Sequence, residues 1–440
     1  MAKDVIDSGS SAFSPCFEIV PDKVLVDEIV SIRLLGFETN QLITVRARMK
    51  DDLGKQWESY ATFKADGHGV VDVNSQKPLS GTYDGVDPMG LFWSMAMDPN
   101  EKKISIFMKR TLTPIIVTLT AEVDGKTIAS GNLERSFIAP NITGTPIREN
   151  GLVGTFFHSS DSGPRPGVIV LSGSSGGALE HYASLLASHG YAALALAYFA
   201  MEDLPTELVN IPLEYFEKAI HWMQGQETVD GDKLAVMGRS RGGELSLLLG
   251  ATFPEIKTVI AFVPSGIIWA GLPQRDGVQP AWTHHGKPLP FVSPGFTGSS
   301  RIEFEQKVRA GMPIRLTPYF LKGMEDEIAV EKATIPVEKI NGPVLLISGQ
   351  DDQMWPSSFF CKLVIDRLDK HNHLYPYKHL NYKGAGHMIG PDFMPKTFTI
   401  MRHPVKDTLY ELGGNAKDYA FASSDSWSKT MRFLGQKLKQ

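Results

Sequence analysis

A serine flanked by glycines separates a short apolar run from a leucine-rich one. The stretch Gly238-Arg239-Ser240-Arg241-Gly242 matches the pattern G-x-S-x-G, with the apolar run 234–237 before it and the run 244–250 after it. A strand, a tight turn and a helix in this order hold the serine oxygen clear of the backbone, at the positive end of the helix. Glycines are needed there because a Cβ atom would collide with the neighbouring strand or helix. We interpret Ser240 as a nucleophile, although a helix N-cap serine would fit the same pattern.

A serine nucleophile needs a base within hydrogen-bond reach, and that base needs a third group to orient it. In α/β-hydrolases the acid and then the histidine follow the serine in the chain. Asp351 and Asp352 come just after the apolar strand 344–347, where a carboxylate would share the sheet edge with Ser240. We favour Asp352 as the acid, with Asp351 as the alternative, and turn stabilisation would explain either one. His387 follows in the glycine-rich loop 384–386 and is the predicted general base.

Five other histidines lie in predicted loops with no partner visible in the sequence, and we expect them at the solvated surface: His284, His285, His371, His373 and His379. The pairs among them could bind a metal ion, but no further ligands follow at a recognisable spacing. The sequence therefore predicts no metal site.

The chemistry also needs donors for the oxyanion of a tetrahedral intermediate. One should be the backbone N–H of Arg241, and the other should come from Gly173 or Ser174 in the loop 172–177, which follows a buried apolar strand. Each donor stabilises the transition state by about 3 kcal/mol. A phosphate-cradling turn is the alternative for this loop, but it has neither the full G-x-G-x-x-G pattern nor the Walker lysine. No metal or redox cofactor is implied.

Two predicted domains hold these residues. After a polar segment, 1–16, residues 17–140 show short runs that alternate with period two, separated by turn signals, which predicts an immunoglobulin-like β-sandwich. Residues 141–440 alternate buried strands with helices, which predicts an α/β-hydrolase domain. Within it, residues 264–335 are rich in Pro, Gly and aromatic residues. We expect this insertion to lie over the active site and to form part of an acyl pocket, or else to pack at the periphery.

Composition narrows the class of protein. The chain has 440 residues, 42% apolar and 21% charged, as soluble globular proteins do. A net charge of -5 argues against nucleic acid as the main partner. Two distant cysteines, Cys16 and Cys361, make no disulfide framework. With no signal peptide, no apolar run of spanning length and no S-K-L ending, we expect a cytoplasmic protein without a membrane partner; the oligomeric state stays open.

Over nearly its whole length the sequence resembles the acyl-CoA thioesterase / bile acid-CoA:amino acid N-acyltransferase family. The similarity rests on Gly-x-Ser-x-Gly-Gly-Glu-Leu, Gly-Gln-Asp-Asp, Gly-Ala-Gly-His, the run Tyr191 to Tyr198, and Gly413-Gly414 with Ser426-Trp427 before a last helix. The resemblance implies a triad of Ser240, Asp352 and His387. It also implies hydrolysis of an acyl-CoA substrate through an acyl-serine.

Two other reactions stay open under this resemblance. One is acyl transfer from CoA to an amine or amino acid, although that branch of the family carries cysteine at the nucleophile position, where this chain has Ser240. The other is a carboxylesterase or dienelactone-hydrolase-like activity. Arg239 and Arg241 flank the nucleophile and could bind an acidic substrate, through CoA phosphates or an acyl carboxylate. Ion pairing with acids such as Glu244 is the equal alternative.

Overall fold

The computed structural model describes residues 14–98, 106–161, 163–273, 277–390 and 393–438. These residues form two compact units. The first contains residues up to 98 together with 114–136, and the second contains 106–113 together with 137–438. Residues 106–113 thus fall in the second unit, whereas we expected them in the sandwich. Most of the polar segment 1–16 lies outside the described residues.

The first unit is a β-sandwich of two sheets. Its alternating sequence puts every second side chain inside, as with Val45 and Ala47 in one strand and Ala61 and Phe63 in the next. The larger sheet runs in the order β2 (Lys23–Leu25), β10 (Lys126–Ser136), β9 (Ile115–Val123), β4 (Leu42–Lys50), β5 (Gln56–Lys64) and β7 (Ser80–Gly81), and β8 (Ala96–Met97) also pairs with β5. The smaller sheet contains β1 (Cys16–Val20), β3 (Ser31–Leu35) and β6 (Val71–Asp72), and α1 (Gly90–Trp93) is a single turn.

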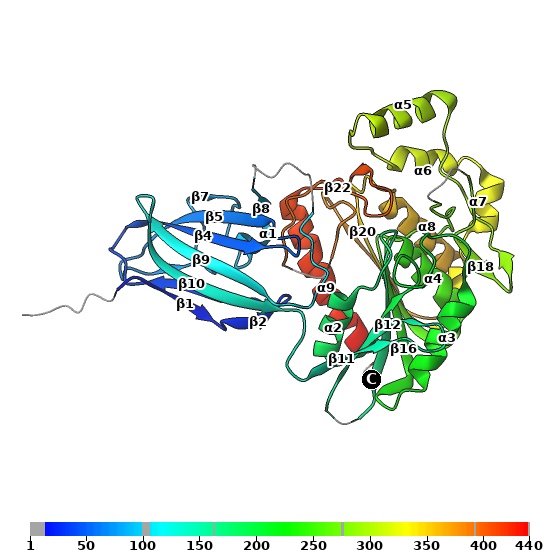
Figure 1. Cartoon of the computed structure of the whole chain (residues 1–440), viewed down its shortest axis with the longest axis horizontal. Coiled ribbons are helices and arrows are strands. Elements are labelled where there is room, and N and C mark those ends of the chain that lie inside the picture. Colours follow the sequence, from blue (N-terminus) through cyan, green and yellow to red (C-terminus); the bar gives the residue numbers. More distant parts are fainter. Residues whose placement is uncertain (1–13, 99–105, 162, 274–276, 391–392, 439–440) are drawn as a thin grey trace, which may run out of the picture. The chain divides into compact units, whose positions relative to one another are not determined.

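The second unit is built on an eight-stranded sheet (Figure 1). Its strands follow the order β11 (Ile142–Ile147), β12 (Val153–Ser159), β14 (Ala192–Ala197), β13 (Arg165–Leu171), β16 (Val229–Arg239), β17 (Ile256–Phe262), β20 (Val344–Gly349) and β21 (Tyr377–Tyr382). β12 pairs antiparallel with β11 and β14, and the other neighbours are parallel. β14 lies between β12 and β13, although it follows β13 in the chain. This crossover, with antiparallel pairing at one edge of an otherwise parallel sheet, is the α/β-hydrolase fold that the sequence predicted.

Helices cover both faces of this sheet. α2 (Glu180–Ser188) and α9 (Ala416–Leu438) lie on one face in Figure 1, and α3 (Leu213–Gln224), α4 (Arg241–Thr252) and α8 (Ser357–Lys370) lie on the other. The strands between them are buried on both sides, which explains their continuous apolar runs: all six residues of β14, Ala-Ala-Leu-Ala-Leu-Ala, are buried. A rigid parallel sheet of this kind presents the loops at its carboxyl edge in fixed positions.

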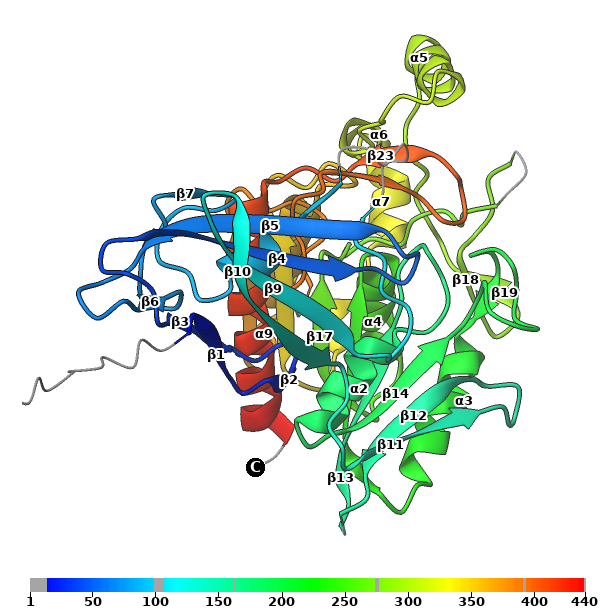
Figure 2. The same ribbon diagram turned by 60° about the vertical axis from the view of Figure 1, so that its left-hand side comes forward.

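An insertion separates β17 from β20. It contains β18 (Trp282–His284), β19 (Lys287–Pro288), α5 (Gly298–Arg309), α6 (Thr317–Gly323), α7 (Glu327–Ala333) and the 3₁₀ turn η1 (Val337–Lys339). β18 pairs with β15 (Ile211–Pro212). α5 has no buried residue, and Figures 1 and 2 both show it standing away from the sheet.

A hairpin near the C-terminus packs against this insertion. Its strands are β22 (Ile400–Arg402) and β23 (Leu409–Glu411). Ile314, just before α6, forms a parallel bridge with Tyr410 of β23, and Figure 2 shows β23 beside α6. Within the described residues, no helix combines the length and the apolar character that crossing a membrane requires.

Candidate active site

Ser240 occupies a strained turn between β16 and α4. Its backbone angles are φ 56° and ψ −120°, a conformation that non-glycine residues avoid. The turn requires glycine on both sides. A Cβ on Gly238 would lie 2.0 Å from the carbonyl oxygen of Gly242, and one on Gly242 would lie 2.2 Å from that of Ser172. Strain of this kind persists only where the surrounding structure imposes it, and here it holds a hydroxyl at the start of a buried helix.

The structure brings the three predicted residues together. Nε2 of His387 lies 3.0 Å from Oγ of Ser240, and Nδ1 lies 2.8 Å from Oδ2 of Asp352. Because the carboxylate accepts the Nδ1 hydrogen, Nε2 carries the lone pair and accepts the serine hydroxyl hydrogen. The side chains of Asp352 and His387 are 1% and 6% exposed, so little water competes for these bonds.

Asp352 is itself held in place by its own loop. Its Oδ1 accepts the backbone N–H groups of Met354 and Trp355, and its Oδ2 accepts the hydroxyl of Ser357 at 2.6 Å. Thr317, in the insertion, donates its hydroxyl to the carbonyl oxygen of Asp352 at 2.9 Å. Four donors therefore fix the loop and the carboxylate, which presents one oxygen to His387.

The two regions expected to supply oxyanion donors meet at Ser240. Arg241 is the first residue of α4, where a backbone N–H has no intrahelical acceptor. A Cβ built on Gly173 would lie 3.2 Å from Cβ of Ser240, a tight contact that glycine avoids. Ser174 follows directly and directs its Oγ to Nε2 of His403, 2.9 Å away.

The arginines beside the nucleophile have different surroundings. The guanidinium of Arg241 is buried, and it donates to Glu244 Oε2 and to the carbonyl oxygen of Trp269, each at 2.9 Å. Glu244 in turn accepts Nε1–H of Trp282 at 2.9 Å. Burial raises the pKa of Glu244 to about 7, with the attraction of Arg241 acting in the opposite direction. For Arg241 the structure favours ion pairing over substrate binding, because its 4% exposure leaves no open path to a ligand.

Arg239 turns toward the histidine loop. Its Nη2 donates to the carbonyl oxygen of His387 at 3.2 Å and also lies against Sδ of Met388. The residue as a whole is half-buried. The contact ties the nucleophile turn to the loop that carries the base.

Comparison with known proteins identifies the family. The profile described as "Acyl-CoA thioester hydrolase/BAAT N-terminal region" matches residues 27–149, and the one described as "BAAT / Acyl-CoA thioester hydrolase C terminal" matches residues 211–440. The chain belongs to the acyl-CoA thioester hydrolase/BAAT family.

Relatives in this family carry two kinds of name. A mouse peroxisomal succinyl-coenzyme A thioesterase is 30% identical over 428 residues, which cover 94% of each chain. A mouse acyl-coenzyme A amino acid N-acyltransferase 1 is 33% identical over 436 residues, covering 96% of this chain and 97% of the relative. Among solved structures, a dienelactone hydrolase-like promiscuous phosphotriesterase from metagenomic libraries has a TM-score of 0.38 and 18% identity, covering 67% of this chain and 98% of its own.

An apolar cluster adjoins the histidine and acid loops of this family member. Its buried members include Tyr319, Met354 and Tyr410, and Phe304 and Met388 pack against them partly exposed. Met354 follows Asp352 by two residues and Met388 follows His387 directly. This cluster therefore offers an apolar surface next to the base. By contrast, Trp269 and Trp282, which belong to the insertion that we expected to form part of an acyl pocket, are 1% and 0% exposed and lie in the domain core.

A hollow of about 790 Å³ adjoins the acid loop. It is lined by Asp352, Phe359, Lys362 and Lys378, among others. Neither Ser240 nor His387 is among the described residues that line it. The hollow is therefore not where the thioester carbonyl or another scissile bond would lie.

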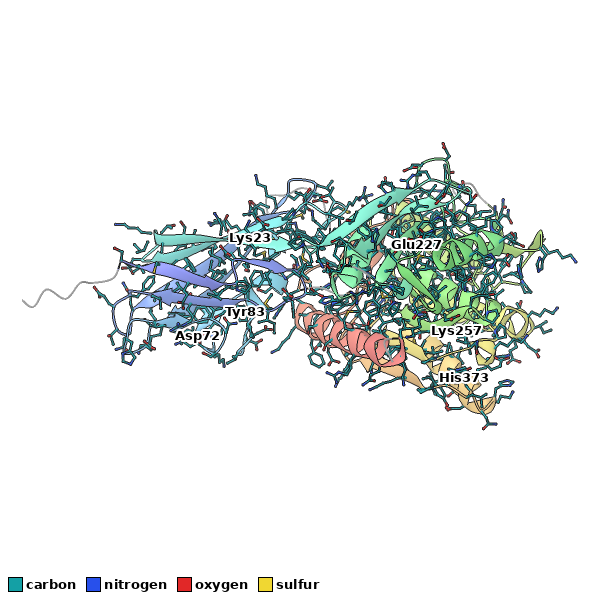
Figure 3. All side chains as sticks on the ribbon, turned by 90° about the horizontal axis from the view of Figure 1, so that it is seen from below. Lys23, Asp72, Tyr83, Glu227, Lys257 and His373 are labelled. Atoms are coloured by element: carbon teal, nitrogen blue, oxygen red, sulfur yellow. The ribbon has the colours of Figure 1, made fainter. Side chains whose placement is uncertain are left out.

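The other histidines differ in their surroundings. His379 is half-buried and also lines this hollow; its Nε2 lies 2.7 Å from Oγ of Ser348, and its partial burial lowers the pKa of His379 to about 4, so it is less solvated than we expected. His373 lies near the outer edge of the second unit in Figure 3, with Nε2 3.2 Å from the carbonyl oxygen of Gly342. The half-buried His284 and the exposed His285 stack, with ring centroids 4.0 Å apart.

The pair His284 and His285 has an acidic neighbour that the sequence did not reveal. Of the residues that the structure describes, these two and Glu214 place one ligand atom each within 4.8 Å of one another. Three such atoms could hold a transition metal ion. Glu214 lies about 70 residues earlier in the chain, at the start of α3, so spacing alone could not have indicated it.

His403 is the residue near the site that sequence reasoning missed. It lies in the turn of the β22–β23 hairpin and is 3% exposed. Neither a motif nor a distinctive spacing marks it, because its partner Ser174 lies 229 residues earlier in the chain.

Proposed function

We propose that this protein hydrolyses acyl-CoA thioesters through an acyl-serine intermediate. The observation that carries the proposal is the hydrogen-bonded chain from Asp352 through His387 to Ser240, at 2.8 and 3.0 Å, on a chain of the acyl-CoA thioester hydrolase/BAAT family. The strained turn at Ser240 supports it, because such strain gathers at functional sites.

In this mechanism Oγ of Ser240 attacks the thioester carbonyl carbon as Nε2 of His387 takes the hydroxyl proton. The carbonyl oxygen becomes an oxyanion, which accepts the N–H of Arg241 and a donor from the loop 172–177. The carbon–sulfur bond then breaks, and the CoA sulfur leaves with the proton from His387. Water, deprotonated by His387, next attacks the acyl-serine ester; the bond between the carbonyl carbon and Oγ breaks, and His387 returns the proton to Oγ, which releases the acid and restores Ser240. Throughout, Asp352 keeps the imidazole in the required tautomer and stabilises its charged form.

A second candidate is acyl transfer to an amino acid. The observation that favours it is the mouse N-acyltransferase relative, whose identity of 33% exceeds that of the thioesterase relatives, which are 30% identical. An amine would then replace water in attacking the acyl-serine. The N-acyltransferase branch that this chain resembles carries cysteine at the nucleophile position. The serine at position 240 therefore supports hydrolysis instead.

The test is release of free thiol from a panel of short, long, dicarboxylic and aromatic acyl-CoAs, with glycine or taurine present in parallel samples. Ser240→Ala is the control, and we expect it to abolish release. An amide product would favour the transferase, and turnover of simple oxygen esters without any thioester would leave an esterase. Thiol release that persisted in Ser240→Ala would contradict both the serine thioesterase and the transferase.

A further inference from the structure

His403 makes side-chain hydrogen bonds on both edges of its ring. Nδ1 lies 3.3 Å from the backbone nitrogen of Val405 and 3.1 Å from that of Lys406. Nε2 lies 2.9 Å from Oγ of Ser174. The ring also packs edge-on against Tyr410, with centroids 5.9 Å apart. A buried histidine with both nitrogens engaged is held in one orientation.

These contacts define which nitrogen carries the hydrogen. Both backbone groups at Nδ1 are donors, so Nδ1 accepts and has no hydrogen of its own. Burial, assisted by the charges of Lys406 and His387, lowers the pKa of His403 to about 4, so the ring is neutral near pH 7. The hydrogen of a neutral ring must then be on Nε2, and His403 donates it to Ser174.

The bond decides how Ser174 can use its own hydroxyl. Because Oγ accepts from His403, the Ser174 hydrogen must point elsewhere. Ser174 is half-buried and directly follows Gly173, which approaches Ser240 so closely that a Cβ there would lie 3.8 Å from the nucleophilic Oγ. Ser174 is thus one residue away from a backbone position that borders the nucleophile.

We propose that Ser174 donates its hydroxyl to the oxyanion and that His403 is the positioning residue that orients it. The inference rests on the proposed acyl-serine chemistry and deepens it, because it names a side-chain donor beside the backbone N–H of Arg241. A neutral, buried donor at Nε2 also strengthens the Ser174 hydroxyl as a donor, since hydrogen bonds in a chain polarise one another.

A matched pair of substitutions separates the two edges of the ring. In His403→Asn the amide oxygen takes the place of Nδ1 and keeps the turn at Val405 and Lys406, but nothing reaches Ser174. In His403→Gln the longer side chain places its amide nitrogen near the position of Nε2 and keeps that donor. We expect His403→Asn to lower kcat for thiol release by about tenfold or more, with KM little changed, because the lost interaction matters only in the transition state. His403→Gln should retain more activity than His403→Asn.

The double-mutant cycle with Ser174→Ala decides the proposal. Loss of an oxyanion donor lowers kcat by roughly 100- to 1,000-fold, so we expect that range for Ser174→Ala. Because His403 acts through Ser174, adding His403→Asn to Ser174→Ala should lower kcat no further. Thermal unfolding of every variant establishes that it is folded at the assay temperature.

Three results would overturn the inference. The first is a kcat of Ser174→Ala within about threefold of the parent value. The second is a double variant in which the two losses of kcat multiply. The third is a kcat of His403→Gln no higher than that of a folded His403→Asn. Each of these is distinct from failure of the proposed function, which would show itself as thiol release by Ser240→Ala or as no thiol release by the parent protein.

Discussion

Oδ2 of Asp352 lies 2.8 Å from Nδ1 of His387, whereas the adjacent Asp351 bonds to other partners. Oδ2 of Asp351 accepts the backbone N–H of Gly414 at 2.8 Å, and its Oδ1 accepts the side-chain amide of Gln353. Two neighbouring carboxylates thus have separate tasks. One orients an imidazole, and the other joins two loops.

The first prediction compares Asp352→Asn with Asp351→Asn. The amide of Asp352→Asn can donate to Nδ1, which would stabilise the tautomer with the hydrogen on Nε2 and deprive Ser240 of its base. By analogy with the triad of serine proteases, we expect kcat to fall about 10⁴-fold. Asp351→Asn keeps an acceptor oxygen and should change kcat by less than about tenfold. Both are measured by thiol release at saturating acyl-CoA.

Thermal unfolding of the two variants provides the control, since a misfolded Asp352→Asn would lose activity trivially. Equal losses in two folded variants would show that the Asp352–His387 bond has no special role. A larger loss in Asp351→Asn would transfer the role to the other carboxylate.

Most of the features that could be predicted depend on residues close together in the sequence. The strand, glycine turn and helix around Ser240 are contiguous, so their pattern indicated both the turn and the α/β-hydrolase fold, and the family resemblance is confirmed by the two profiles. The order of acid and histidine after the serine follows from the fold itself, since successive parallel strands end at one edge. That order was enough to select Asp352 and His387, which the structure places in contact with each other.

Contacts between distant segments could not be predicted. The pairing of His403 with Ser174 depends on where a hairpin docks, and no spacing records it. The two uses of Arg241 were indistinguishable in sequence, because only the fold shows that its guanidinium is buried against Glu244. His379 was expected in a solvated loop because the sequence showed no partner for it, whereas it lies half-buried on β21 with its ring nitrogen at hydrogen-bond distance from Ser348.

The second prediction concerns the ion pair under the nucleophile. Arg241→Met leaves Glu244 buried without its cation, and Glu244→Gln leaves the guanidinium without its anion. Removing one partner of a buried pair typically costs about 3–5 kcal/mol, so we expect each single variant to be destabilised by that amount in urea unfolding. The double variant should lose much less than the sum, because the glutamine oxygen still accepts Nε1–H of Trp282 and no charge remains unpaired. Additive losses would show that the pair is not coupled.

The third prediction concerns the apolar cluster beside the base. Phe304 packs on Phe296 and Tyr319, with ring centroids 5.4 and 5.7 Å away, and is partly exposed. If this surface receives the acyl chain, Phe304→Ala should lower kcat/KM for long-chain acyl-CoA by about 10- to 100-fold, the effect of losing a few methylene contacts. Short-chain substrates should be unaffected. Phe421→Ala is the matched control, since Phe421 lies on α9 with 63% exposure, outside this cluster. Equal loss for all chain lengths would place the acyl chain elsewhere.

The last prediction concerns stability in acid and uses His379. Burial lowers the pKa of its folded form from 6.5 to about 4. Between these two values the unfolded chain binds a proton that the folded chain does not, so the free energy of unfolding decreases as the pH falls from 6.5 toward 4. Above 6.5 both forms are neutral and the contribution is complete.

His379→Gln keeps an amide donor toward Ser348 and removes the titrating group. Urea unfolding at about pH 7, 6 and 5 should therefore show a shallower loss of stability in His379→Gln than in the parent protein. His371→Gln is the control, because His371 is exposed at the C-terminal end of α8, ahead of the strand β21 that carries His379. Parallel curves for all three proteins would mean that His379 takes up its proton with an ordinary pKa, and that the pocket around Ser348 admits water.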